Sequence, residues 1–498
     1  MNIEKTHLRV LLLMTIVVVS CSTSPASPTA TPGLAPPTST PALPIREATP
    51  SPSPEPPAIE IPTEGKVSAD GPWLVYYDFY TERLIAIDQN GQAWQSFEIP
   101  KPDNFAFFPA PSGGHLAYVS GSAFLPQPDH ELVILQIPVG KIVRRISLFG
   151  PTWQEQIVEQ GLETEYHMFE NDVLRGLQGE GAVAWSSDGT KVAFTAAIEG
   201  PSSDLYLLDL SSGEIERLTS GPLQAYELNW SPDDAWIVHL SVDTFGTGAG
   251  WNVDTLWAAA SDGSSVMRVV DNVRMTFVEA WQSETDFLAT EWGADFGPQG
   301  LFRFSIEKRT REILFEGPLP ALAFDGDVST AAIFKDPMVA AYFDYVPGVY
   351  VIDLATGEQI IVEQTEEVSN SIVWVDSVEM YAATFEERTI LFDRSGTLHV
   401  EISRGGLLTP SPDGSFLAIY GDRWRGEPGL AIFTTSGEEL AQPASEWVFM
   451  VTWSPDSRVA FYETDASLYV LSAEDMTTTM LKKDVPDWPE AYFWIPAP

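Results

Sequence analysis

Cysteine is almost absent from this chain of 498 residues, since Cys21 is the only one. No disulfide can form within the chain, and no cysteine-rich metal site can be built. The six histidines are scattered, and none of them pair at the spacing of metal ligands. We therefore expect neither a disulfide scaffold nor a metal or other cofactor.

Positive charge is also scarce, because 27 Lys and Arg stand against 70 Asp and Glu and the formal net charge is -43. Such a chain repels the phosphates of nucleic acid, so nucleic acid is not expected as a partner. The simpler interpretation of the charge is an acidic, well-hydrated surface that keeps the protein soluble. A cation-rich or basic partner is the alternative.

Long hydrophobic runs are missing at the start of the chain. Val10 to Val19 is apolar apart from Thr15, but it is too short to cross a bilayer, which needs about 20 residues. Lys5 and Arg9 precede it, which is the layout of a secretory signal peptide. Residues 1–20 are therefore expected to be a signal peptide.

The end of this segment, Val18-Val19-Ser20-Cys21, resembles the bacterial lipobox. The resemblance implies that Cys21 becomes the first residue of the mature chain and carries lipid, and several acyl chains would make the anchor stable. A plain signal peptide with a chance cysteine is the alternative. We expect a protein held outside the cytoplasm on the bacterial cell membrane, through its N-terminal lipid only.

Large apolar residues are nearly absent from residues 21–65, which are rich in Pro, Thr and Ser. Such a segment has nothing to bury and is expected to be disordered or extended. As a polyproline II chain it rises about 3.1 Å per residue, so its upper reach is roughly 130 Å. We interpret it as a stalk.

From about residue 66 the chain is a succession of short strands at regular spacing, a pattern typical of sheets or propellers. One recurring unit is a polar turn followed by an apolar strand, and the Asp-Gly pair that it often contains suits a tight turn. The clearest copies are SSDGTKVAF (186–194), SPDDAWIVH (231–239), SPDGSFLAI (411–419) and SPDSRVAF (454–461).

These turns and strands resemble the WD40-like repeats of the TolB-type β-propeller, in which a W-S-P-D-G turn precedes an apolar strand. Trp185, Trp230 and Trp453 stand just ahead of three of the turns, and Pro410 takes that place in the fourth. The resemblance is strong over 182–270 and 405–482 and weak over 276–402. It implies an all-β fold, a single propeller of four-stranded blades over residues 66–498.

The number of blades follows from the number of repeated units. Propellers have four to eight blades as a rule, so we predict about eight, with seven or nine as alternatives. The first unit is one strand short, and the tail Ala491 to Pro496 is expected to supply that strand and close the ring. Nine candidate units begin near Trp73, Phe105, Ala182, Ala225, Phe277, Ala321, Ser371, Leu407 and Trp447.

One stretch interrupts the strands, at about 153–178, with apolar residues at helical spacing. It predicts one or two short helices inserted between blades, either packed as a cap or serving as a docking helix. Long loops are also expected between the second and third strands of several blades. They are Gly121 to Asp129, Val242 to Val253, Gly293 to Gly300, Lys335 to Pro347 and Gly421 to Gly429.

The resemblance places these long loops on one rim of the propeller, together with the helical insert. Aromatic and Arg residues most often anchor interfaces, and flat rings also suit sugar faces. The alternative for each ring is that it packs down onto its own loop. The predicted ligand rim consists of Phe124, Phe245, Trp251, Trp292, Phe296, Tyr342, Tyr345, Arg423, Trp424 and Arg425.

Catalytic motifs are missing as well: the chain has no G-x-S-x-G, and FGTGAG (245–250) lacks the Lys of a phosphate loop. We therefore predict a non-catalytic, monomeric binding or scaffold module for a protein, peptide or envelope glycan. One alternative is a propeller hydrolase or lyase that acts on carbohydrate in the central funnel, where titratable side chains would converge. Another is a purely structural component of the envelope.

Overall fold

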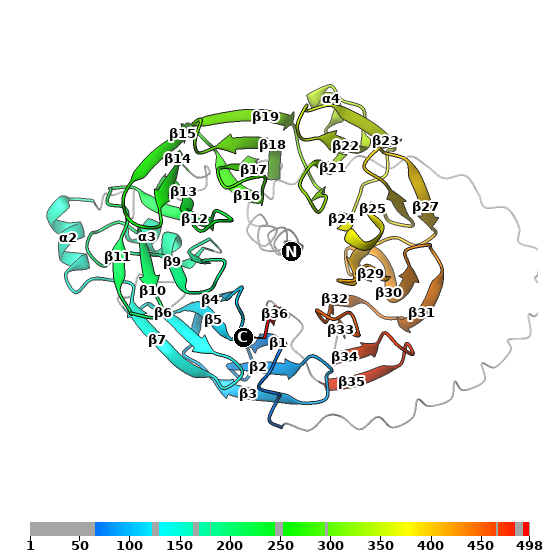
Figure 1. Ribbon diagram of the computed structural model, residues 1–498, viewed down its shortest axis with the longest axis horizontal. Coiled ribbons are helices and arrows are strands. Elements are labelled where there is room, and N and C mark those ends of the chain that lie inside the picture. Colours follow the sequence, from blue (N-terminus) through cyan, green and yellow to red (C-terminus); the bar gives the residue numbers. More distant parts are fainter. Residues whose placement is uncertain are drawn as a thin grey trace, which may run out of the picture. The chain divides into compact units, whose positions relative to one another are not determined.

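Nine four-stranded antiparallel sheets stand around one central axis (Figure 1). This computed structural model describes residues 65–121, 129–162, 169–179, 181–244, 252–293, 297–464, 467–483 and 492–497. The prediction of a single all-β propeller with four-stranded blades is confirmed. The structure has nine blades, one of the predicted alternatives to eight, because each of the nine candidate units becomes a blade of its own.

Within each blade the four strands are named in order from the innermost, next to the axis, to the outermost. Blade 1 contains β36 (Phe493–Ile495), β1 (Trp73–Asp78), β2 (Arg83–Asp88) and β3 (Trp94–Glu98). Blade 2 contains β4 (Pro102–Pro109), β5 (His115–Ser120), β6 (Glu131–Gln136) and β7 (Lys141–Ser147). Blade 3 contains β8 (Val183–Trp185), β9 (Lys191–Ala196), β10 (Asp204–Asp209) and β11 (Ile215–Arg217). Blade 4 contains β12 (Gln224–Trp230), β13 (Trp236–Thr244), β14 (Asn252–Ala260) and β15 (Val266–Asp271).

The remaining blades follow in chain order. Blades 5 and 6 contain β16 (Met275–Trp281), β17 (Asp286–Gly293), β18 (Gly297–Ser305) and β19 (Thr310–Glu316); and β20 (Leu322–Phe324), β21 (Thr330–Lys335), β22 (Gly348–Asp353) and β23 (Gln359–Gln364). Blades 7 to 9 contain β24 (Ser371–Val375), β25 (Met380–Thr384), β26 (Thr389–Phe392) and β27 (Leu398–Ile402); β28 (Leu407–Pro410), β29 (Phe416–Asp422), β30 (Arg425–Thr434) and β31 (Glu439–Ala444); and β32 (Val448–Trp453), β33 (Val459–Thr464), β34 (Ser467–Ser472) and β35 (Thr478–Lys483).

The alternating strand directions give the ring two different faces. One face, here called the upper face, carries the loops between the second and third strands and the connections between blades. The other, the lower face, carries the turns between the first and second and between the third and fourth strands. The helices α2 (Trp153–Gln160), α3 (Phe169–Gln178) and α4 (Ala340–Phe343) all belong to upper-face segments.

The ring is closed by its last strand. β36 pairs antiparallel with β1, with Trp73 opposite Ile495 and Val75 opposite Phe493. The end of the chain therefore supplies the innermost strand of the first blade, as the sequence predicts. Ile495 is fully buried, so this strand is also part of the core.

The recurring turn fixes its own conformation and links neighbouring blades. In the copy at 454–459, Ser454 Oγ donates to Asp456 Oδ1 at 2.7 Å and accepts from the Val459 amide at 3.1 Å. Trp453, just ahead of the turn, donates its indole N–H to the Thr409 carbonyl on the inner strand of blade 8. Trp185 and Trp230 do the same toward blades 2 and 3, at Phe108 and Ala184.

The indole hydrogen bond predicts a measurable stability effect. Trp453→Phe keeps most of the apolar ring but leaves the Thr409 carbonyl without this donor, so we expect the free energy of unfolding to fall by about 1–2 kcal/mol. Urea denaturation followed by circular dichroism measures it. Trp424→Phe is the matched control, because the Trp424 side chain is exposed, and it should change stability by less than about 0.5 kcal/mol. Equal effects of the two substitutions would show that the hydrogen bond does not hold the blades together.

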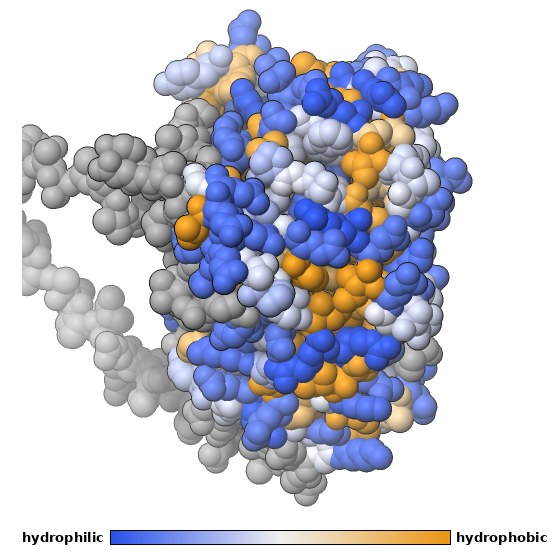
Figure 2. Space-filling view, turned by 90° about the vertical axis from the view of Figure 1, so that its left-hand side faces the viewer, coloured by the Kyte–Doolittle hydropathy of each residue, from blue (hydrophilic) through white to orange (hydrophobic). Residues whose placement is uncertain are grey.

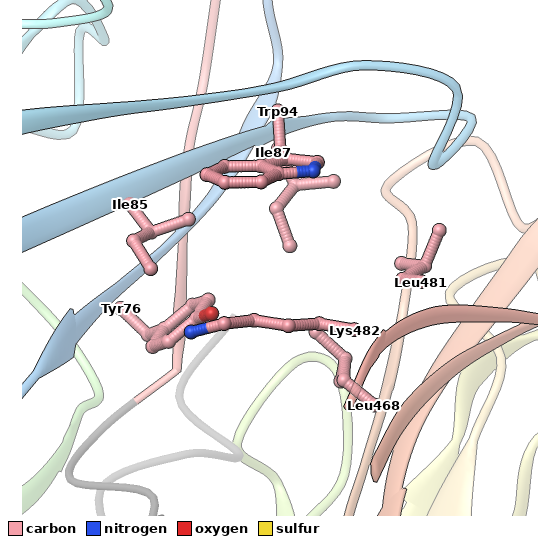
Figure 3. A pocket seen from close by; sticks show the side chains of 7 residues that line it. All are labelled: Tyr76, Ile85, Ile87, Trp94, Leu468, Leu481 and Lys482. Atoms are coloured by element: carbon pink, nitrogen blue, oxygen red, sulfur yellow. The ribbon is translucent and has the colours of Figure 1, made fainter. Parts of the chain in front are cut away.

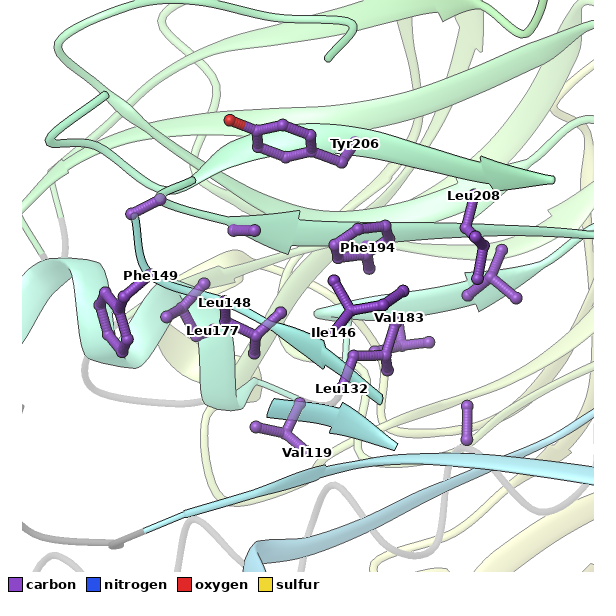
Figure 4. Close-up of a cluster of buried hydrophobic side chains, with 14 of the residues drawn as sticks. Val119, Leu132, Ile146, Leu148, Phe149, Leu177, Val183, Phe194, Tyr206 and Leu208 are labelled. Carbon is purple, nitrogen blue, oxygen red and sulfur yellow. The ribbon is translucent and has the colours of Figure 1, made fainter. Parts of the chain in front are cut away.

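Two helices occupy the connection between blades 2 and 3, the stretch where the apolar spacing predicts an insert. α2 buries Trp153 and Ile157, and α3 buries Phe169, Val173 and Leu177 among its buried residues, against the core shared by the two blades. Figure 4 shows Leu177 among the side chains of this core. Most of the apolar residues described in this connection therefore pack onto the blades, so that the two helices form a cap. The opposite side of α2 carries Val158, which is exposed.

The N-terminal segments expected from the sequence, residues 1–20, Cys21 and the stalk, lie outside the described residues. Among the helices that the structure describes, none combines the length and the apolar character that crossing a bilayer requires.

Candidate functional site

Exposed apolar side chains are distributed unequally between the two faces. Among the described residues, eight large apolar residues are exposed on the outermost strands. The one side of the molecule that Figure 2 shows has hydrophobic patches among hydrophilic residues. Another eight lie on upper-face segments, and one, Val139, lies on a lower-face turn among the described residues. The upper-face set is Phe79, Tyr80, Val158, Met338, Tyr342, Val346, Val368 and Trp424.

The exposed aromatic rings are distributed even more unequally between the two faces than the exposed apolar residues as a whole. In the described part of the chain the four exposed ones are Phe79, Tyr80, Tyr342 and Trp424, and each belongs to a loop between the second and third strands of its blade. Tyr342 is 84% exposed and Trp424 is 67% exposed, so most of each side chain is not packed against the protein. We call the upper-face set of eight residues the apolar rim.

The predicted ligand rim is only partly exposed. Tyr342 and Trp424 project into solvent, whereas Trp292 lies edge-on against Phe277 at 5.6 Å between ring centroids. Arg423 is exposed but lies over the Phe449 ring, and Arg425 begins β30, half-buried. Phe124, Phe245, Trp251 and Phe296 lie outside the described residues.

Tyr345 is held inside its own loop. Its hydroxyl donates to the Asp336 carbonyl at 3.0 Å, and its ring stacks on Phe343. The Lys335 ammonium lies 5.7 Å from the Tyr345 ring and 3.8 Å from the Tyr350 ring, and burial lowers its pKa. This ring is therefore part of the loop's packing, which is the alternative that the sequence left open.

The sequence-based prediction of the ligand rim does not include six members of the apolar rim. Phe79 and Tyr80 lie in the short loop of blade 1, whereas the predicted rim is drawn from long loops. Val158, Met338, Val346 and Val368 are not aromatic, and a single exposed aliphatic residue is ordinary on any surface. Position is the one available signal: once the strands are aligned, all six fall on upper-face segments.

Buried titratable groups occur in several blades, and Tyr76, Tyr492 and Glu463 lie together at the seam between blades 9 and 1. Burial raises the pKa of Asp204 to about 6 against the pull of Arg217, lowers the pKa of His239 to about 4, and raises the pKa of Glu291. These three residues belong to blades 3, 4 and 5. Asp204 and Glu291 each face an arginine, at 2.6 and 2.7 Å, so both carboxyl groups are accounted for by ion pairs within the blade.

The lower face carries many carboxylates, and several of them accept hydrogen bonds within their own turns. Asp209 accepts from the Ser212 amide and from the hydroxyls of Ser211 and Ser212, and these hydrogen bonds lower its pKa to about 2. Asp188 and Asp353 accept comparable bonds, and the pKa of each is lowered in the same way. Over the described ranges, no three His, Cys, Asp or Glu side chains gather so as to hold a metal ion.

A small cavity lies at the seam between blades 9 and 1 (Figure 3). It holds about 10 Å³ of free volume and is lined mainly by apolar side chains, among them Ile85, Trp94 and Leu481. That is at the lower limit of the space that one water molecule needs. The cavity is a packing gap, too small for an organic ligand.

No protein-family model matches the chain, and no curated protein matches its sequence. Solved structures share its architecture. A eukaryotic initiation factor matches with a TM-score of 0.53 at 12% identity, over 86% of this chain and 99% of that one. The dipeptidyl peptidase 4 of Porphyromonas gingivalis matches with a TM-score of 0.47 at 11% identity, over 76% of this chain and 60% of that one.

An oligogalacturonate lyase in complex with manganese also matches, with a TM-score of 0.34 at 16% identity, over 60% of this chain and 88% of that one. At such identities the likeness shows the fold alone. The fold and the site together define a nine-bladed β-propeller whose upper face carries the apolar rim.

Proposed function

We propose that this chain is a non-catalytic binding module that holds a protein, peptide or envelope glycan on its upper face. In this proposal the chain belongs with the TolB-like and WD40-like propellers, carries lipid at Cys21, and works as a monomer outside the cytoplasmic membrane. The stalk, residues 21–65, holds the propeller away from the membrane surface.

One observation carries the proposal: all four exposed aromatic rings among the described residues lie on upper-face loops. Exposing a large ring to water is unfavourable unless something covers it, and Trp and Tyr are the side chains that most often dominate binding energy. The lower face offers one exposed large apolar residue, Val139, over the same described ranges.

Photo-crosslinking from the two faces tests the proposal. Benzoylphenylalanine is placed at position 342 or 424 of the full-length chain, and at position 139 as the lower-face control. We expect a partner to be crosslinked from positions 342 and 424 and not from position 139. Crosslinking from 139 alone, or from none of the positions with glycan arrays also negative, would overturn it.

The partner so identified allows a quantitative prediction. Trp424→Ala should weaken its binding by about 30-fold, which corresponds to about 2 kcal/mol for a hot-spot ring. Val139→Ala should change it by less than twofold. The fold must persist in both variants, and thermal unfolding checks this.

A further inference from the structure

Three upper-face segments of blades 6 and 7 form one continuous surface. They are the loop 336–347 of blade 6, the connection 365–370 and the loop 385–388 of blade 7. The Thr365 amide donates to the Pro347 carbonyl, and Arg388 Nε donates to Glu367 Oε2 at 3.0 Å. We call this surface the blade 6–7 sector.

The sector holds half of the apolar rim. Met338 is 80% exposed and Tyr342 is 84% exposed, and Val346 and Val368 are exposed as well. Three of these four side chains are aliphatic, and methionine adapts its shape to different partners. Such a surface suits the side chains of a polypeptide better than the flat face of a sugar ring, which prefers aromatic stacking.

The cations of the sector are already engaged. The Lys335 side chain is buried, and its Nζ donates to Gln359 Oε1 at 2.7 Å. Arg388 donates to Glu363 at 2.9 Å and to Glu367 at 3.0 Å. Neither side chain is left to bind an anion.

The carboxylates of the sector are in excess. Asp344, Glu366, Glu386 and Glu387 are exposed, and Asp336 is half-buried. In the part of the chain that the structure describes, no Lys or Arg lies within ion-pair distance of any of these five. The sector therefore joins exposed apolar side chains to uncompensated negative charge.

We propose that the blade 6–7 sector binds a cationic polypeptide segment in which Lys or Arg alternates with apolar residues. Its apolar side chains cover Met338, Tyr342 and Val368, and its cations lie over the surrounding carboxylates. This inference rests on the proposed function, since it names the partner chemistry for part of the same upper face. An anionic or neutral glycan would leave the carboxylates unused.

The test uses three fluorescent 12-residue probes and the purified full-length chain in mild detergent, with binding followed by fluorescence anisotropy. One probe alternates Lys with Leu, the second Lys with Ser, and the third Glu with Leu. We expect the Lys–Leu probe to bind at least tenfold more tightly than either of the others. Binding of the Lys–Leu probe should weaken as salt is added, because the contact is electrostatic.

Matched variants separate a local site from the overall negative field. Glu386→Gln/Glu387→Gln removes two charges from the sector, and Glu307→Gln/Glu358→Gln removes two from exposed lower-face turns. The first pair should weaken the Lys–Leu probe about tenfold and the second less than twofold. Tyr342→Ser/Val368→Ser should weaken it at least tenfold at unchanged net charge.

Three results would overturn the inference: no binding of the Lys–Leu probe, equal binding of the Lys–Leu and Lys–Ser probes, or equal effects of the two charge-removing variants. Crosslinking from positions 342 and 424 tells the two proposals apart. If crosslinks form but the Lys–Leu probe does not bind, the proposal of a cationic partner is wrong while the proposal of an upper-face binding site remains. If both fail, the binding face falls as well.

Discussion

Removal of residues 488–498 is expected to unfold the propeller rather than to shorten it. The deletion takes away β36, whose Phe493 and Ile495 are buried against β1 and blade 2. Burying two such side chains contributes roughly 3–6 kcal/mol. That amount is comparable to the whole stability of many domains, about 5–15 kcal/mol.

The deletion also exposes the edge of β1 along Trp73, Leu74 and Val75, which is a template for pairing with other chains. We therefore expect loss of the cooperative thermal transition and aggregation, measured by calorimetry and light scattering. Deletion of Pro498 alone keeps the paired strand and is the control. A truncated chain that melts within a few degrees of the full-length chain would show that the ring does not depend on this closure.

Arg217→Met is expected to destabilise the protein by about 3 kcal/mol at pH 7. Arg217 Nη2 donates to Asp204 Oδ2 at 2.6 Å, and the Asp204 side chain is 2% exposed. Without the arginine a buried carboxylate stays uncompensated, which is the costly way to break an ion pair. Denaturant unfolding at pH 7 measures the loss.

The effect should depend on pH in a defined direction. Burial raises the pKa of Asp204 to about 6 in the folded protein, above its ordinary value of 3.8. The contribution of this group to stability is therefore fully present below about pH 4 and is lost as the pH rises through 6. In Arg217→Met the carboxyl is protonated still more readily, so the variant should lose less stability at pH 5 than at pH 7.

Two further variants control this prediction. Arg145→Met breaks the equivalent pair with Glu131 in blade 2, where the side chains are 49% and 30% exposed, and should cost less than about 1 kcal/mol. Asp204→Asn/Arg217→Met removes the buried charge and should be more stable at pH 7 than Arg217→Met alone. A loss in Arg217→Met that does not change with pH would rule out the uncompensated carboxylate as its cause.

The fold was largely predictable because the repeated turn has a local cause. In each clear copy a serine hydroxyl closes the turn, and in three of the four a tryptophan just ahead of it links to the preceding blade, as Ser454 and Trp453 do. All nine units could be counted from the sequence, and nine was among the predicted blade numbers, although the usual limit on propeller size favoured eight. How many blades fit around the ring depends on how neighbouring blades pack, and no single repeat encodes that.

The site was less predictable, because exposure depends on what surrounds a loop. Tyr342 and Tyr345 are three residues apart in one loop, but one projects into solvent and the other stacks on Phe343 and lies beside Lys335. Nothing in their local sequence separates them. The charge of the sector was equally hidden, since the engagement of Arg388 by Glu363 and Glu367 joins residues from two blades.

The pairing of β36 with β1 has a consequence for how the protein is made. The ribosome makes β36 after all the other strands of the propeller, so the ring cannot close until Phe493–Ile495 has been synthesised. Contacts between such distant parts of a chain carry a large loop-closure cost and are slow to form. Until then the edge of β1 is unpaired in every nascent molecule. A chaperone that covers this one strand would therefore give the greatest protection against pairing with other chains.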